Sequence, residues 1–133
     1  MSVFRQLLKS KIHRATVTEA NVDYVGSVTI DQTLLDRVDI WPGELVHVWN
    51  CSNGERFETY ALSGTANSGI ICLNGAAALK VNVGDKVIIA AFALTEKPIR
   101  AKVILVDENN KFTKAVEPEP SGSWDSKLDQ NVV

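Results

Sequence analysis

Apolar and polar positions alternate in short runs along the chain, and turn signals separate the runs. This pattern predicts a mainly β domain. The strand-like runs lie at residues 3–8, 11–18, 28–30, 45–50, 56–62, 69–73, 87–94 and 102–106, and the last of these is the final regular strand that we expect. Around seven short strands with little helix favour a small closed barrel, because closure removes exposed strand edges.

The pattern also predicts one or two short helices. Asp31 is a favourable N-cap, and Leu34, Leu35 and Val38 follow at helical spacing, which predicts a helix over residues 32–38. The run NGAAA at 74–78 is typical of a turn followed by a second, shorter helix.

The C-terminal sequence differs in composition from the rest of the chain. Residues 116–133 are polar, rich in Pro, Ser, Asp and Glu, and offer little to bury. We therefore expect one domain over residues 1–115 and a flexible tail over 116–133.

Composition narrows the class of protein. The chain has 133 residues and a formal charge of -2, which argues against a nucleic-acid binder. No apolar run is long enough to cross a membrane, and the first residues lack the apolar core of a signal peptide, so we expect a cytoplasmic protein. Cys51 and Cys72 lie in apolar stretches without ligand spacing, which predicts reduced thiols and no metal site.

The dipeptide Gly26-Ser27 is able to support an unusual reaction. A Gly-Ser pair is usually only a turn, but a glycine can adopt backbone angles closed to other residues and so hold a strained peptide bond. The serine hydroxyl can attack the preceding carbonyl and turn the amide into an ester. Removal of the serine α-proton then expels the Gly26 carboxylate, and hydrolysis of the resulting dehydroalanine leaves a pyruvoyl group.

Several motifs occur together in a recognisable order. They are KIHR at 11–14, YVGS at 24–27 with ID at 30–31, WNCSNGERFETY at 49–60, NGAAA at 74–78, and VGD at 83–85 with VII at 87–89. In this order and spacing the chain resembles the bacterial aspartate 1-decarboxylases over roughly residues 4–95.

The resemblance implies a double-psi β-barrel that assembles as a homotetramer, with active sites between subunits. It implies self-cleavage into a β chain (1–26) and an α chain (27–133), helped in some cases by an accessory maturation factor. The pyruvoyl group from Ser27 would replace PLP and a metal as the electron sink, through a Schiff base with L-aspartate. The product would be β-alanine for pantothenate and coenzyme A synthesis.

The resemblance also assigns roles to single residues. Tyr60 resembles the proton donor, and Thr59 resembles the residue that hydrogen-bonds the Gly26 carbonyl during self-cleavage. Lys11 and Arg56 are the candidates for the two substrate carboxylates, although each taken alone is a surface residue. The further substrate-pocket candidates are Tyr24, Thr59, Asn74, Gly75, Ala76 and Ala77, with Trp49, His13 and Ile88 as residues that shape the pocket.

Thr59 and Tyr60 are adjacent, so on a regular strand they face opposite sides. Both can serve one site only if the strand is bulged or if the site lies between subunits.

Three alternatives stay open at this point. One is an uncleaved, non-catalytic β-barrel that acts as a binding or scaffold module. Another is a pyruvoyl decarboxylase of a different acidic amino acid, such as glutamate, because one methylene changes binding by only about 1–3 kcal/mol. The third is a serine hydrolase that pairs Ser27 with His13, but the GxSxG motif, an acid partner and an oxyanion loop cannot be identified.

Overall fold

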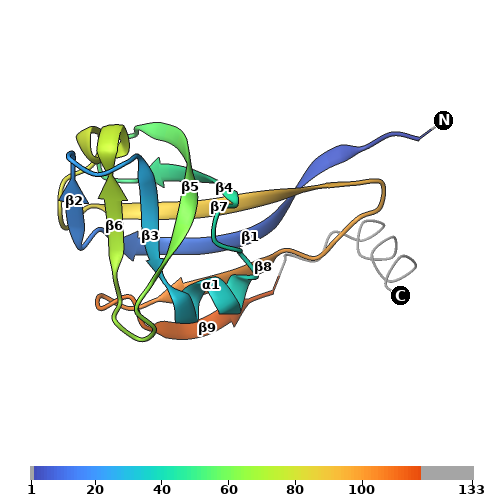
Figure 1. Cartoon of the computed structure of the whole chain (residues 1–133). Helices are drawn as coiled ribbons and strands as arrows, with labels where there is room; N and C mark the ends of the chain where they lie inside the picture. The colour runs from blue at the N-terminus through green and yellow to red at the C-terminus, as the bar shows by residue number, and fades with distance from the viewer. Residues whose placement is uncertain (1, 118–133) are drawn as a thin grey trace.

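The computed structural model describes residues 2–117, and these residues form a mainly β domain, as predicted (Figure 1). The strands are β1 (Arg5–Thr16), β2 (Glu19–Asn21), β3 (Ser27–Asp31), β4 (Leu45–Asn50), β5 (Arg56–Gly64), β6 (Ile71–Asn74), β7 (Lys86–Thr95), β8 (Lys102–Val106) and β9 (Phe112–Val116). The helix α1 (Gln32–Val38) and the 3-10 helix η1 (Gly75–Lys80) confirm the two short helices.

The nine strands pair in the order β2-β6-β3-β5-β4-β7-β1-β8-β9. Three of these pairs are parallel, namely β1–β8, β2–β6 and β3–β5, and they join strands that are distant in the sequence. Figure 1 shows β3, β5 and β6 crossing the direction of β1, β4 and β7. The closed double-psi barrel is a finer description of this sheet and stays a prediction.

The first two predicted strands are in fact one. β1 runs from Arg5 to Thr16 along β7, with register shifts between Leu8 and Ser10 and between Ile12 and Ala15. Ser10 interrupts the apolar pattern but is fully buried, and its hydroxyl donates to the backbone oxygen of Val38. Ser10 was interpreted as the end of a strand because it is polar, whereas its hydrogen bond allows it to lie buried within one continuous strand.

Two strands were missed. β2 lies in the polar stretch after residue 18 and pairs with β6, which is far along the chain. β9 follows β8, so the expectation that residues 102–106 form the final strand is wrong. Both strands lie at the ends of the sheet order, where exposed polar side chains hide the alternation that marks a half-buried strand. The predicted tail lies outside the described residues from position 118 onward.

The N-cap of α1 confirms the role of Asp31 and extends it. Its Oδ1 accepts hydrogen bonds from the backbone N–H of Thr33 at 2.8 Å and of Asn67 at 2.9 Å, and its Oδ2 accepts from Gly69 at 2.8 Å. Burial alone would raise the pKa of Asp31, but these backbone donors outweigh it and lower the pKa. One carboxylate thus fixes both the helix and the loop that leads to β6.

The layer made by β5, β4, β7 and β1 has two faces that matter for the site. One face contributes Ile12, Val48 and Ile89 to the core, and all three are fully buried. Because neighbouring residues on a strand alternate in direction, His47 and Ala90 belong to the opposite, outer face. Among residues 2–117 no helix is long and apolar enough to cross a membrane.

Candidate active site

Ser27 is the first residue of β3, and its side chain is fully buried. It lies opposite Asn74 in the antiparallel pairing of β3 with β6. The Asn74 Nδ2 donates to the Ser27 Oγ at 3.0 Å, and the Ser27 hydroxyl donates to the backbone oxygen of Val25 at 3.4 Å. The hydroxyl oxygen is therefore held beside the Gly26-Ser27 peptide bond by contacts on two sides.

Two residues beneath Ser27 were missed by the sequence analysis. Thr29 lies opposite Cys72 in the same strand pair, and the Asn74 Nδ2 also donates to the Thr29 Oγ1 at 3.2 Å. The Cys72 thiol donates to the Asn74 Oδ1, with 3.2 Å between sulfur and oxygen. The spacing of two residues from Ser27 and from Asn74 is the signal that could have found them, since alternate residues share a face.

A cavity of about 270 Å³ opens at Gly26. It is lined by Gly26, Phe57, Glu58, Thr59, Ala76, Ala77 and Lys80. The structure thus brings together the predicted cleavage site, Thr59 and both predicted pocket alanines, Ala76 and Ala77. Phe57 and Lys80 are further lining residues that sequence reasoning missed, because nothing in their local sequence distinguishes them from packing and surface residues.

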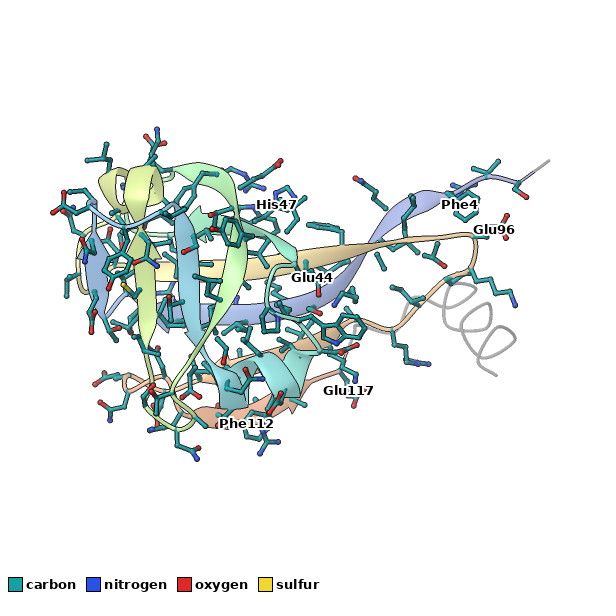
Figure 2. The ribbon with its side chains drawn as sticks, in the orientation of Figure 1. Phe4, Glu44, His47, Glu96, Phe112 and Glu117 are labelled. Carbon is teal, nitrogen blue, oxygen red and sulfur yellow. The ribbon has the colours of Figure 1, made fainter. Side chains whose placement is uncertain are left out.

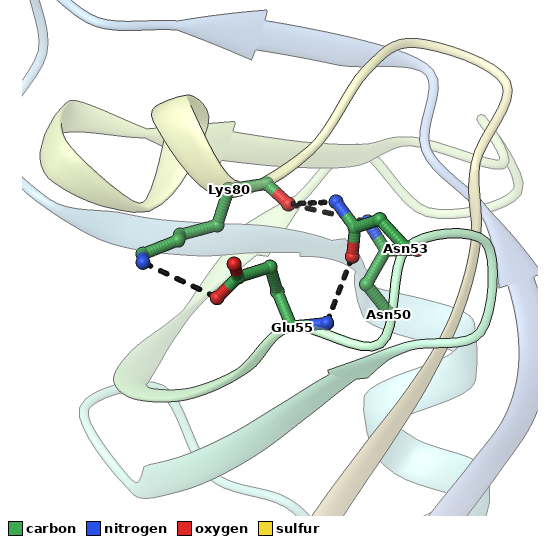
Figure 3. Close-up of polar contacts among 4 residues, drawn as sticks. All are labelled: Asn50, Asn53, Glu55 and Lys80. Carbon is green, nitrogen blue, oxygen red and sulfur yellow. Dashed lines mark hydrogen bonds and ion pairs between the residues drawn. The ribbon is translucent and has the colours of Figure 1, made fainter.

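One wall of this cavity is fixed by polar contacts between the β4–β5 turn and η1 (Figure 3). The backbone oxygen of Lys80 accepts from the side-chain amides of Asn50 at 3.2 Å and Asn53 at 3.0 Å. The Lys80 ammonium contacts the Glu55 carboxylate at 3.2 Å. Since both charged side chains are about half exposed, this ion pair adds little stability, and the two amide contacts position the wall.

The glycine at this site that needs a left-handed backbone conformation is Gly75, and Gly26 does not have one. Gly26 is not among the glycines with positive φ, and a Cβ there would meet nothing closer than 3.8 Å. Gly75 has a φ of +64°, and a Cβ on it would lie 2.6 Å from the Cα and N of Gly26 and 2.7 Å from the Tyr24 oxygen. The scissile segment therefore packs directly on the backbone of Gly75.

The remaining predicted residues gather on the outer face of the sheet. Arg56 is exposed and places its guanidinium over the Trp49 ring, 4.5 Å from the ring centre. Trp49 lies opposite both Arg56 and Ile88 in the strand pairings. Tyr60 is half-buried and shares its side of β5 with Arg56, because the two residues are four apart on a strand.

Lys11 lies on the same outer face, across β7 from His47 through Ala90. It lines a second, open cavity of about 450 Å³ with His13, two apolar residues of β8 and the end of β9. The two cavities share no lining residue, so a single chain does not bring Lys11 to Gly26.

The pairing of β4 with β5 shows no register shift, so β5 is not bulged at Thr59 and Tyr60. Thr59 lines the Gly26 cavity, while Tyr60 points to the outer face. Of the two arrangements that would let both residues serve one site, a bulged strand is thereby excluded.

Comparisons with known proteins identify the family of the chain. A family model described as aspartate decarboxylase matches residues 3–113. The aspartate 1-decarboxylase of Neisseria meningitidis serogroup C is 55% identical over 122 residues, which cover 89% of this chain and 96% of the relative. The chain belongs to the aspartate decarboxylase family. Relatives within this family include the aspartate 1-decarboxylase of Carboxydothermus hydrogenoformans, 55% identical over 90% of this chain, and that of Shouchella clausii, 47% identical over 91%.

In this member of the aspartate decarboxylase family, His13 is not placed to activate Ser27. The contacts of Ser27 Oγ are with Asn74 and Val25, and His13 lines the other cavity. The Nδ1 atom of His13 is buried and has no hydrogen-bond partner among residues 2–117. Burial, followed by the charges of Lys11 and Arg14, lowers the pKa of His13. The serine-hydrolase alternative therefore has no support from the geometry.

Two other expectations concern the surroundings of the site in this family member. Tyr24 is 67% exposed within the single chain, and it lines neither of the two cavities. Within residues 2–117 no group of three or more His, Cys, Asp or Glu side chains could hold a metal ion. Cys51 and Cys72 are both free thiols.

Proposed function

We propose that this chain is an aspartate 1-decarboxylase that converts L-aspartate to β-alanine and CO2, using a pyruvoyl group made by self-cleavage between Gly26 and Ser27. The observation that carries the proposal is the buried Ser27 hydroxyl, held 3.0 Å from the Asn74 amide and beside a cavity that contains Thr59. The family and the relatives named above support the reaction. The product would serve pantothenate and coenzyme A synthesis in the cytoplasm.

The self-cleavage needs no outside oxidant or reductant. Ser27 Oγ bonds to the Gly26 carbonyl carbon, the C–N bond breaks, and the hydroxyl proton ends on the nitrogen, which gives an ester and a free amine. Loss of the α-proton of residue 27 breaks the ester C–O bond and releases the Gly26 carboxylate. Water then replaces the enamine nitrogen, which leaves as ammonia. Thr59 lines the cavity at Gly26 and is the donor for the negative charge that develops on the carbonyl oxygen.

The residues present fit the group that this reaction would form. A pyruvoyl group is a ketone that takes the substrate amine and accepts the electrons left when CO2 departs. Its position at residue 27 keeps it beside Asn74, whose Nδ2 can donate to an oxygen there. Neither PLP nor a metal has a role in this proposal.

The chain's own residues then bind the substrate and move a proton. Arg56 offers two N–H groups to one carboxylate, with its guanidinium held on Trp49, and Lys11 offers a second positive charge. The Tyr60 hydroxyl returns a proton to the substrate carbon after CO2 has left. Ala76 and Ala77 keep the cavity beside Gly26 open because their side chains are small.

We propose that the complete site lies between two copies of the chain in a homotetramer. The Ser27 group of residues and the Lys11 group lie on different faces, and β5 is not bulged. The projecting segment just before β1 exposes Phe4, which is 59% exposed (Figure 2). Near the end of β7, Leu94 is 67% exposed. A second copy of the chain would cover such a surface.

Mixing two inactive variants tests the shared site. We expect Lys11→Ala and Ser27→Ala to be inactive alone, and co-expression to restore activity to about a quarter of the wild-type value if random assembly joins intact faces. The measurement is β-alanine formation by the co-purified oligomer. A mixed oligomer without activity would contradict a site shared between copies, and a monomer would contradict the assembly itself.

The mass of the purified protein over time tests the proposed function. We expect a 1–26 fragment and a 27–133 fragment whose first residue carries a ketone that reacts with hydrazines, together with β-alanine formation from L-aspartate. A slow time course that cell extract accelerates indicates an accessory maturation factor. A chain that stays whole in extract and forms no β-alanine would contradict the proposal and favour a non-catalytic β-barrel. Comparing L-aspartate with L-glutamate separates the proposal from a decarboxylase of another acidic amino acid.

A further inference from the structure

Four side chains form a closed polar group under the cleavage site. Ser27 lies opposite Asn74, and Thr29 lies opposite Cys72, in the antiparallel pairing of β3 and β6. Because each pair is two residues from the other on both strands, all four side chains project from the same face. The function proposed above gives no role to Thr29 or Cys72.

The Asn74 amide can take two orientations in this group. They differ in whether its nitrogen or its oxygen faces the Ser27 hydroxyl. In the observed orientation Nδ2 donates to the oxygens of Ser27 and Thr29, and Oδ1 faces the thiol of Cys72. In the reversed orientation Oδ1 would accept the Ser27 hydroxyl proton, and the amide N–H groups would face sulfur, which is a weak acceptor. The donor at Cys72 therefore favours the orientation in which Ser27 receives an N–H.

We propose that Cys72 is a positioning residue for self-cleavage, because its thiol donates to Asn74 Oδ1 and so directs Asn74 Nδ2 to the attacking oxygen of Ser27. This inference rests on the proposed self-cleavage at Gly26-Ser27. The N–H from Asn74 stabilises the negative charge that grows on Ser27 Oγ as the hydroxyl gives up its proton. Because the Ser27 oxygen accepts from Asn74, its own proton is free to donate to the backbone oxygen of Val25, which belongs to the scissile segment.

The state of the thiol supports its role as a donor. Cys72 is buried, with 6% of its surface exposed. Burial, followed by the nearby Glu19 carboxylate of β2, raises the pKa of the Cys72 thiol, so it remains protonated at neutral pH.

Glu19 is also a competing acceptor for the thiol proton, because it lies opposite Cys72 in the pairing of β2 with β6. Glu19 is exposed, so water can satisfy its carboxylate. Asn74 is only 5% exposed, and its Oδ1 has the thiol as its donor within residues 2–117. Leaving a buried amide oxygen without a donor is the costlier arrangement, so the proton belongs to the contact with Asn74.

Three variants test the inference, with the rate of conversion of whole chain into the 1–26 and 27–133 fragments as the readout. We expect Cys72→Ala to slow self-cleavage about threefold to tenfold, the effect of losing one hydrogen bond. Cys72→Ser keeps a donor and is expected to restore the rate to within about twofold of wild type. Cys51→Ala is the matched control at an exposed cysteine, and it should cleave at the wild-type rate.

A packing role predicts a different result. If Cys72 only fills space, the polar serine would be at least as harmful as alanine, and equal rates in the two variants would overturn the inference. Melting temperatures measured in the Ser27→Ala background, where all chains stay whole, show whether either variant is misfolded. A wild-type chain that never cleaves would contradict the proposed function itself, whereas cleavage of Cys72→Ala at the wild-type rate would contradict this inference alone.

Discussion

Replacement of Ser27 by alanine is expected to leave the chain whole and to reduce aspartate decarboxylation to the background rate. The alanine has no oxygen to attack the Gly26 carbonyl, so neither the ester nor the ketone can form. Without an electron sink the carbanion left by CO2 is too unstable to form at a useful rate. Mass spectrometry of the variant and a β-alanine assay over the same time course measure both losses.

Ser10→Ala is the matched control for this experiment. Ser10 is also fully buried, and its hydroxyl also donates to a backbone oxygen, that of Val38, but it lies on β1 away from the Gly26 cavity. Its loss should cost about 1 kcal/mol of folding free energy without preventing cleavage. Full activity of Ser27→Ala, or an equal loss in Ser10→Ala, would refute the assignment of the cofactor to residue 27.

The pattern of apolar and polar residues was sufficient to predict elements that depend on neighbouring residues alone. The helix over Gln32–Val38 begins at Asp31 and buries Leu34, Leu35 and Val38, as their spacing predicts. Alternation along β5 also separated Thr59 from Tyr60 correctly, and the unshifted register of β4 with β5 left a site between copies as the remaining arrangement.

Local pattern failed where pairing joins distant segments. Residues 19–21 form the strand β2 because they pair with β6, which lies some fifty residues later in the chain. Their own amino-acid composition does not indicate a strand. Thr29 and Cys72 are ordinary strand residues until the register of β3 with β6 places them under Ser27. The resemblance to the family named candidate residues for the site, but their division between two faces came only from the strand pairings and the cavities.

Replacement of Gly75 by alanine is expected to slow self-cleavage about a hundredfold or more. The new Cβ would lie 2.6 Å from two backbone atoms of Gly26 and 2.7 Å from the Tyr24 oxygen, so the scissile segment must move away from η1. A backbone cannot rotate aside as a flexible side chain can, and reacting atoms must stay within about 3–3.5 Å to react. A displacement approaching 1 Å of the Gly26 carbonyl from Ser27 Oγ is enough for a loss of that size.

Gly84→Ala is the control that separates the effect of backbone strain from the effect of the contact between residue 75 and Gly26. Gly84 also has positive φ, +95°, but a Cβ there meets nothing within 4 Å. Backbone strain should cost each variant about 1–2 kcal/mol of stability, and the contact with Gly26 should add to the loss in the Gly75 variant. Urea unfolding in the Ser27→Ala background measures both losses. The Gly84 variant should nevertheless cleave close to the wild-type rate, because its scissile segment is undisturbed. If the two variants cleave equally fast, the contact between Gly75 and Gly26 does not hold the peptide bond in place for attack.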